Sequence, residues 1–190
     1  MPDFHPVVLL PADAVVLDLT AKTTFPSTIH PWSIGRYDED RAIYDQPLFQ
    51  GAEPRSVHMG IDLGGPAGVA VHAFADGVVL HAGINDASGD YGPTLVTAHV
   101  VDGEPLWALH GHLSAASLAR SPVGRHFRAG TVLGWIGEPA ENGGWPPHLH
   151  FQLTTDRPDT HDLPGVVSHA ERAAARMRFP DPRRVLGPIY

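Results

Sequence analysis

Two pairs of histidines, each separated by a single residue, are the groups in this sequence that most readily suggest chemistry. His148 and His150 form one pair, and His110 and His112 form the other. In an extended strand alternate side chains point to the same face, so the imidazoles of a pair lie on one face, roughly 6–7 Å apart. Imidazoles at that separation can begin a metal site or transfer protons, provided that other segments supply further groups.

A third segment offers the carboxylate that such a metal site needs. His58 and Asp62 are four residues apart, with Gly60 between them. The glycine disfavours a helix, and an extended segment with this even spacing keeps both side chains on one side. Adding one more imidazole gives two histidines and one carboxylate, and catalytic zinc sites commonly have three protein ligands and an open position for water. The chain has no cysteine, so any metal has to be held by His, Asp, Glu and water.

Short strands with explicit turns have to position these groups. The dipeptides Asp76-Gly77 and Asp102-Gly103 each lie between two apolar runs and tolerate the positive φ of a tight hairpin turn. They predict two β-hairpins, which pair residues 69–74 with 78–81 and residues 95–101 with 106–113. In the last of these strands, Trp107 and Leu109 would occupy one face and His110 and His112 the other.

Two more strands follow, with a loop between them. Residues 131–136 are a short apolar run after a turn, and residues 137–147 form a loop by composition. The strand that begins at His148 would turn Leu149, Phe151 and Leu153 toward a core, while Gln152 shares the histidine face.

Residues 1–57 are rich in Pro and aromatic residues without a sustained period, and we expect an irregular N-terminal extension there. Residues 58–190 form the domain proper. It ends in one short helix at about 169–178, since Ser168 and Glu171 make a capping-box signature and Pro180 stops the helix.

Composition limits the class of protein. The 20 Gly and 19 Pro residues make long helices improbable, so we predict a mainly β fold, an antiparallel sheet or sandwich with short connections. The net charge of −8, with scattered Lys and Arg, argues against a nucleic-acid or anionic-membrane surface. No stretch approaches the ~20 apolar residues of a membrane span. Residues 1–20 lack the pattern of a signal peptide, which predicts a cytoplasmic protein, or an extracytoplasmic one if the chain is a fragment of a longer exported protein.

The order of the polar motifs resembles a known family. His58-x-x-x-Asp62, then His112-Leu113-Ser114, then His148-x-His150 is similar to the LytM/lysostaphin-type peptidases, family M23, from about residue 55 to residue 153. The resemblance implies a sheet of the LytM type and one zinc ion. It implies that His58, Asp62 and His150 bind the metal and that His112 and His148 are the unligated catalytic pair. Metal-activated water would then attack a peptide bond in peptidoglycan cross-bridges or other short peptides.

Two features depart from the usual family pattern. His110 stands where the family often has Tyr, and it is either a substrate-facing residue or a packed substitute. The loop at residues 141–147 is not Ser/Thr/Gly-rich, so Asn142 and Trp145 are candidates for substrate binding at an altered groove wall. The loop, together with residues 34–37 and 41–44, also looks like the M23-type modules of larger multidomain proteins, beside kinase-like and aminotransferase-like domains. This leaves open an alternative, a metal-bearing binding or scaffold module of a larger system with weak or no hydrolysis.

Overall fold

One large sheet dominates the computed structural model, which describes residues 4–21, 31–44 and 47–190. Within these ranges eight strands pair in the order β1-β2-β5-β12-β9-β8-β7-β10, and every pair is antiparallel except β1–β2. The strands of the large sheet are β1 (Val15–Val16), β2 (Ser33–Gly35), β5 (Ile61–Gly64), β7 (Gly77–Asn85), β8 (Gly92–Val101), β9 (Glu104–Gly111), β10 (His126–Phe127) and β12 (His148–Thr154). The mainly β, antiparallel fold expected from the sequence is therefore confirmed.

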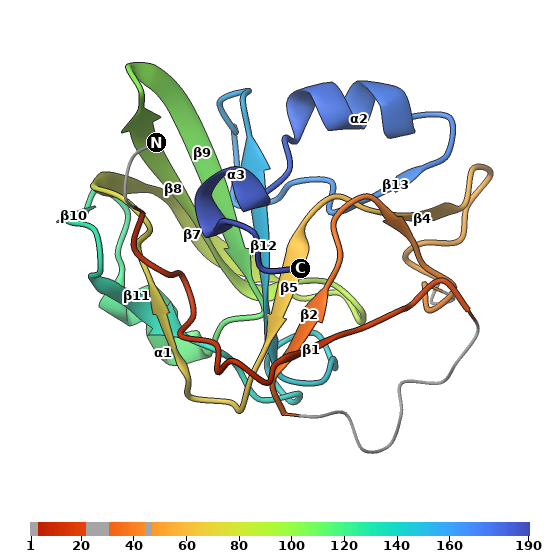
Figure 1. Cartoon of the computed structure of the whole chain (residues 1–190), viewed down its shortest axis with the longest axis horizontal. Coiled ribbons are helices and arrows are strands. Elements are labelled where there is room, and N and C mark those ends of the chain that lie inside the picture. The colour runs from red at the N-terminus through yellow and green to blue at the C-terminus, as the bar shows by residue number, and fades with distance from the viewer. Residues whose placement is uncertain (1–3, 22–30, 45–46) are drawn as a thin grey trace.

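Two small sheets and three short helices complete the described part of the chain (Figure 1). The small sheets are β6 (Ala70–His72) with β11 (Val132–Trp135), and β3 (Glu39–Asp40) with β4 (Arg55–His58) and β13 (Val166–Ser168). The helices are α1 (Ala115–Arg120), α2 (Arg172–Arg178) and α3 (Arg183–Leu186). None of the helices in the described ranges is long and apolar enough to cross a membrane.

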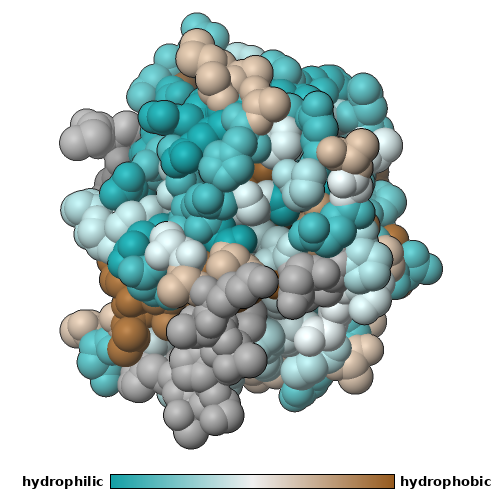
Figure 2. Space-filling model, turned by 90° about the vertical axis from the view of Figure 1, so that its right-hand side faces the viewer, coloured by the Kyte–Doolittle hydropathy of each residue, from teal (hydrophilic) through white to brown (hydrophobic). Residues whose placement is uncertain are grey.

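Apolar side chains cover both faces of the large sheet. On one face Phe151 belongs to a cluster with Val71 and Leu133 of the β6–β11 pair. On the other face Leu109 belongs to a cluster with Val167 of β13 and Phe179 at the end of α2. The face of the molecule shown in Figure 2 is mostly hydrophilic, with an apolar patch beside the residues drawn in grey. The central strands are therefore held from both sides, which fixes the direction of each side chain.

Several predicted elements are present. Strands β8 and β9 form the second predicted hairpin, with Asp102 at φ 53° and Gly103 at φ 84° in the two-residue loop. Strand β12 alternates as expected, since Leu149, Phe151 and Leu153 are fully buried in the first cluster.

The first predicted hairpin, residues 69–74 with 78–81, is wrong. Strand β6 pairs with β11, and β7 pairs with β8 and β10. Asp76 and Gly77 lead the chain from the small sheet to the large one: the Asp76 side chain accepts a hydrogen bond from the Ala129 backbone N–H, and the Asp76 carbonyl accepts one from the His99 ring. A Cβ on Gly77 would lie 2.5 Å from the Ala98 carbonyl oxygen, so the glycine serves close strand packing.

The C-terminal helix begins later than predicted. Helix α2 starts at Arg172, and Ser168 lies at the end of β13. The Glu171 carboxylate still accepts hydrogen bonds from the backbone N–H and the hydroxyl of Ser168. Helices α1 and α3 were not predicted, because stretches of six and four residues are too short for a clear period.

Several described segments before residue 58 are built into the sheets. Strand β2 pairs with β5, and β3 and β4 pair with one another and, through β4, with β13. In Figure 1 the small sheet of β4 and β13 lies on the opposite side of the molecule from the β6–β11 pair. The described part of the N-terminal segment thus contributes strands on the side where His58 lies.

The expectation that His110 and His112 share a face is wrong. His110 pairs with Phe151 across the sheet and lies on the core face, with its ring 5.3 Å from the Phe151 ring. His112 follows the end of β9 and has a φ of 61°, the left-handed conformation, which interrupts the strand alternation. His112 lines the pocket described below, and His110 does not.

His110 is also an unsatisfied polar residue within the core. It is fully buried, and neither ring nitrogen makes a hydrogen bond of normal geometry with the described residues, although the Leu95 and Ala108 carbonyls lie nearby. Burial, aided by the neighbouring His99, lowers the pKa of His110 to about 3. The ring is therefore neutral in the folded protein and protonates far more readily once the chain unfolds.

We expect the substitution His110→Leu to stabilise the fold, most clearly in acid. The pKa of His110 is lower in the folded protein than in the unfolded chain. The contribution of His110 to the free energy of unfolding is therefore fully present above the unfolded pKa of 6.5, and it is lost as the pH falls from there toward 3. Between about pH 7.5 and about pH 5 the variant should lose about 2 kcal/mol less free energy of unfolding than the wild type. Urea unfolding at both pH values measures this, with the surface variant His126→Leu as control. An equal loss in both proteins would contradict the prediction.

Candidate metal centre

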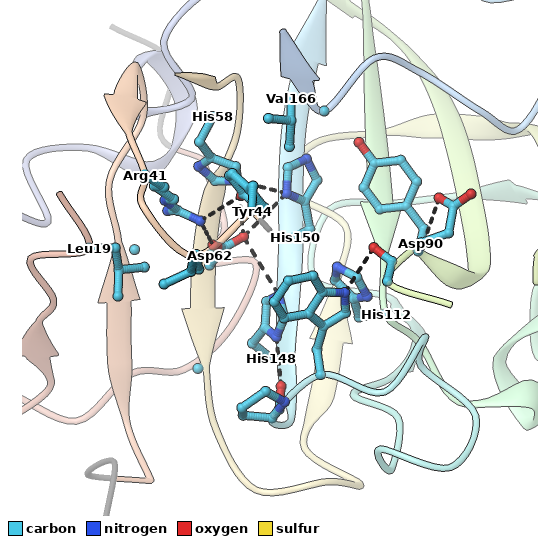
Figure 3. Close-up of a pocket in the computed structure, with 18 of the residues that line it drawn as sticks. Leu19, Arg41, Tyr44, His58, Asp62, Asp90, His112, His148, His150 and Val166 are labelled. Atoms are coloured by element: carbon cyan, nitrogen blue, oxygen red, sulfur yellow. Dashed lines mark hydrogen bonds and ion pairs between the residues drawn. The ribbon is translucent and has the colours of Figure 1, made fainter. Parts of the chain in front are cut away.

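Three side chains from two sheets converge at the junction of β4, β5 and β12 (Figure 3). The register of β5 and β12 sets Asp62 directly opposite His150, so the two point to the same face. His58 ends β4 and reaches the same point from the small sheet. Asp62 Oδ1 lies 3.3 Å from His58 Nε2 and 3.2 Å from His150 Nδ1. The two residues closest in sequence, His58 and Asp62, thus belong to different sheets and not to one extended segment.

Hydrogen bonds indicate which ring nitrogen of His58 and of His150 carries a proton. His58 Nδ1 lies 2.9 Å from the Arg36 carbonyl oxygen, which can only accept, so Nδ1–H is the donor. His150 Nε2 donates to Gln152 Oε1 at 3.0 Å, and the Gln152 amide nitrogen in turn donates to the Pro164 carbonyl. Each neutral ring therefore presents the lone pair of its other nitrogen to the centre of the cluster.

The resulting arrangement suits a cation. His58 Nε2 and His150 Nδ1 are 2.9 Å apart, yet both bear lone pairs when the rings are neutral, and Asp62 Oδ1 is a third acceptor. Three possible electron-pair donors within 4.8 Å of one another are complementary to a metal ion that accepts from all three. Imidazole nitrogen and carboxylate oxygen are ligands that zinc takes.

Electrostatics keep the cluster in this state. Burial alone would raise the pKa of Asp62, but His58 and Arg41 outweigh it and hold that pKa well below its usual value. Burial lowers the pKa of His58 to about 4, and the positive charge of Arg41 adds to the effect. The carboxylate is therefore charged and the imidazole neutral near pH 7, which are the protonation states that a metal requires.

Arg41 is a site residue that the sequence did not reveal. Its Nη1 donates to Asp62 Oδ2 at 2.6 Å, and its Nε donates to Glu39 Oε2 at 3.0 Å. Arg41 and Glu39 are almost completely buried. The contact joins residues 21 positions apart in sequence, and no local pattern around Arg41 indicates it.

The second pair of imidazoles lies beside the cluster. The rings of His112 and His148 are 4.3 Å apart, and His148 Nε2 is 3.8 Å from Asp62 Oδ1. His112 Nδ1 donates to the Asn142 carbonyl at 2.8 Å, and His148 Nδ1 donates to the Pro146 carbonyl at 2.7 Å. Burial lowers the pKa of both rings, so each is neutral with its Nε2 lone pair unused by these bonds. Such nitrogens can accept a proton.

The loop at residues 141–147 supports this pair. Asn142 is fully buried, its side chain binds the backbone of Gly137, Gly144 and Trp145, and it does not line the pocket. Trp145 does line the pocket, and its Nε1 donates to the Gly89 carbonyl at 3.0 Å. Of the three residues considered for substrate binding, the structure thus brings Trp145 to the pocket and leaves His110 and Asn142 outside it.

A pocket of about 530 Å³ is lined by the five polar residues described above, which are His58, Asp62, His112, His148 and His150. Its volume falls in the range of roughly 300–1,000 Å³ that small-ligand sites occupy. The N-terminal segment contributes Leu19 and Tyr44 to the lining of the pocket, and the loop at residues 141–147 contributes Trp145. The rings of Tyr44 and Trp145 pack edge to face with centroids 6.2 Å apart, within a buried cluster that includes Phe49.

A mainly antiparallel β fold and a buried His, Asp, His cluster beside two further imidazoles are features expected of a metal-dependent hydrolase. The sequence profile described as peptidase family M23 matches residues 56–161 of this chain. The match covers more than half of the chain, and the chain belongs to peptidase family M23.

The individual relatives have low sequence identity to this chain. The glycyl-glycine endopeptidase ALE-1 of Staphylococcus capitis is 31% identical over 99 residues, which are 52% of this chain and 25% of that protein. The chain thus matches about a quarter of the length of this relative. The catalytic domain of the antimicrobial peptidase lysostaphin from Staphylococcus simulans has 23% identity and a TM-score of 0.47, over 70% of this chain and 81% of that one. A mutant catalytic domain of the prophage-encoded M23 protein EnpA from Enterococcus faecalis has 23% identity and a TM-score of 0.48, over 73% and 92%.

Gly60 allows the backbone to pass close to the His150 ring, and we expect Gly60→Ala to disrupt metal binding. A Cβ at this position would lie 2.5 Å from His150 Cε1, and the ring cannot move away without losing its bond to Gln152. Zinc affinity should fall by about 10- to 100-fold, the usual cost of disturbing the surroundings of a ligand. Competition with a chromophoric chelator measures the affinity. Gly51→Ala, where an added Cβ meets nothing within 4 Å, is the control, and equal affinities in the two variants would refute this prediction.

Proposed function

We propose that this chain is a zinc-dependent endopeptidase that hydrolyses peptide bonds in short, glycine-containing peptides or peptidoglycan cross-bridges. The observation that carries the proposal is the convergence of three possible metal donors, His58 Nε2, His150 Nδ1 and Asp62 Oδ1, within 4.8 Å of one another. Membership of peptidase family M23 supports the peptidase reaction.

In this proposal, His58, Asp62 and His150 hold one zinc ion, which when bound lowers the pKa of water and polarises a carbonyl group. His112 and His148 act on the reactants. The free Nε2 of one ring takes a proton from the attacking water, and the imidazolium so formed stabilises the negative charge that develops on the carbonyl oxygen. The same ring then returns the proton to the amine nitrogen as the C–N bond breaks. The carbonyl groups of Asn142 and Pro146 hold both rings in the tautomer that this role needs.

The proposed substrate class follows from the pocket and a relative. The relative from Staphylococcus capitis is a glycyl-glycine endopeptidase, and we extend that bond preference to this chain as part of the proposal. In this proposal, the packed rings of Tyr44 and Trp145 at the pocket restrict it to peptides with small side chains. Among the substrates considered, it favours short free peptides over cross-bridges attached to glycan.

The alternative is a binding or scaffold module that holds metal without hydrolysis. Zinc-loaded protein is incubated with pentaglycine, a peptide library and purified peptidoglycan, and newly formed amines are counted. Peptidase activity that a chelator removes and zinc restores supports the proposal. Tight zinc binding without amine release from any substrate would establish the alternative.

We expect His112→Ala and His148→Ala to retain metal but lose activity. Neither side chain belongs to the three-ligand cluster, so zinc content should stay near one per chain. Loss of a general acid–base group typically costs about 10²- to 10⁴-fold in rate. Metal analysis and peptide hydrolysis on the same preparations measure both quantities. Loss of zinc from either variant would show that its imidazole is a ligand.

Trp145→Leu should widen the substrate range. The wild type should hydrolyse free glycine peptides with a higher kcat/KM than intact peptidoglycan, since the Trp145 ring packs against Tyr44 at the pocket. Removing the ring opens this contact, so the ratio of the two kcat/KM values should move toward the polymer, by several-fold or about 1 kcal/mol of discrimination. Trp107→Leu changes a tryptophan on β9 outside the pocket and is the control. An unchanged ratio in Trp145→Leu, with activity retained, would exclude the aromatic contact as a size filter.

A further inference from the structure

We infer that Arg41, in the segment before the part of the chain that matches the family, is a positioning residue of the metal centre that restricts Asp62 to a one-oxygen ligand. This inference rests on the proposed function, because it assumes that zinc binds at His58, Asp62 and His150. The family match begins at residue 56, so Arg41 lies outside it.

The two oxygens of Asp62 have different partners. Oδ1 faces the two ligand histidines, at 3.3 Å and 3.2 Å. Oδ2 accepts a hydrogen bond from Arg41 Nη1 at 2.6 Å, on the other side of the carboxylate (Figure 3). The charge-assisted hydrogen bond from Arg41 occupies one lone pair of Oδ2 and makes that oxygen the poorer donor, so Oδ1 is favoured as the oxygen for a metal. Without Arg41, both oxygens could bind the same ion and fill the position that a catalytic site keeps open for water.

Arg41 is itself rigidly held. Glu39 binds its Nε, the Tyr44 hydroxyl binds Nη1 at 3.0 Å, and the Arg36 carbonyl accepts from Nη2 at 3.2 Å. The planar guanidinium thus uses all three of its nitrogens, an arrangement that lysine cannot reproduce. The charge of Glu39 offsets that of Arg41, so the pair orients Asp62 with little net repulsion of a cation.

The same segment also orients His58. The Arg36 carbonyl accepts from both Arg41 Nη2 and His58 Nδ1, so one backbone oxygen links the arginine to the tautomer of a ligand. Gly35 makes this approach possible, because a Cβ there would lie 2.7 Å from Arg41 Nη2 and 2.9 Å from Asp62 Oδ2. Two of the three proposed ligands are therefore positioned by residues 35–41.

The test compares Arg41→Met, Arg41→Lys and Gly35→Ala with the wild type in the full chain. Zinc affinity is measured by chelator competition, and Co²⁺ is used as a spectroscopic probe because its visible absorption weakens as coordination rises from four to five. We expect zinc affinity to fall about 10- to 100-fold in Arg41→Met and less in Arg41→Lys. The Co²⁺ absorption of Arg41→Met should weaken as Asp62 gains its second oxygen.

Gly35→Ala keeps every charge and still separates Arg41 from Asp62, so it remains informative if Arg41→Met does not fold. Its zinc affinity should fall as well. Arg172→Met is the matched control, since Arg172 also pairs with an aspartate of the N-terminal segment, Asp38 at 2.8 Å, but lies away from the metal centre.

Wild-type zinc affinity and Co²⁺ absorption in folded Arg41→Met, or in Gly35→Ala, would overturn the inference while leaving the proposed function intact. So would an equal loss in Arg172→Met, because that would indicate general destabilisation. A wild-type chain that binds no zinc would overturn both the proposed function and this inference.

Discussion

The register of three neighbouring strands is the constraint on which the site depends. Strand β12 sets His150 opposite Asp62 on β5 and opposite Gly111 on β9. Because side chains alternate with a period of two, a slip of one residue would turn His150 into the core and bring Phe151 out. Apolar clusters on both faces of the sheet make such a slip costly. The burial of Phe151 and its neighbours therefore fixes the direction of the His150 side chain.

Two glycines allow the backbone to approach the side chains around His150 closely. Gly60 lies against the His150 ring, and Gly111 lies against the Tyr91 ring, which packs 5.0 Å from His150. A methyl group at Gly60 would meet the His150 ring at 2.5 Å, and one at Gly111 would meet the Tyr91 ring at 2.7 Å. The close packing leaves each histidine one orientation, and the carbonyl and amide acceptors around it leave one tautomer. Position and protonation state are thus set by different parts of the structure.

What the sequence predicted correctly depends on local rules. The β8–β9 hairpin follows from Asp102-Gly103, and the two faces of β12 follow from alternation. Helix boundaries and the two shortest helices were missed for local reasons, whereas the failures that concern the sheets and the site involve partners distant in sequence. Asp76-Gly77 resembles a hairpin turn, but its contacts are with residues 99 and 129, so the chain crosses between sheets. The left-handed φ of His112 is imposed by bonds of its backbone to Tyr91 and Gly137, which no local pattern indicates.

Partners distant in sequence also determine where the candidate metal centre lies. His58 belongs to the small sheet, and Asp62 and His150 belong to the large one, so the three donors meet at the junction of two sheets. With neutral rings, the lone pairs of His58 and His150 face one another at 2.9 Å, an arrangement that favours separation of the sheets. A metal bound by all three donors would replace this repulsion with three bonds across the junction. Since only the folded chain brings the donors together, the free energy of metal binding would add to the stability of the fold.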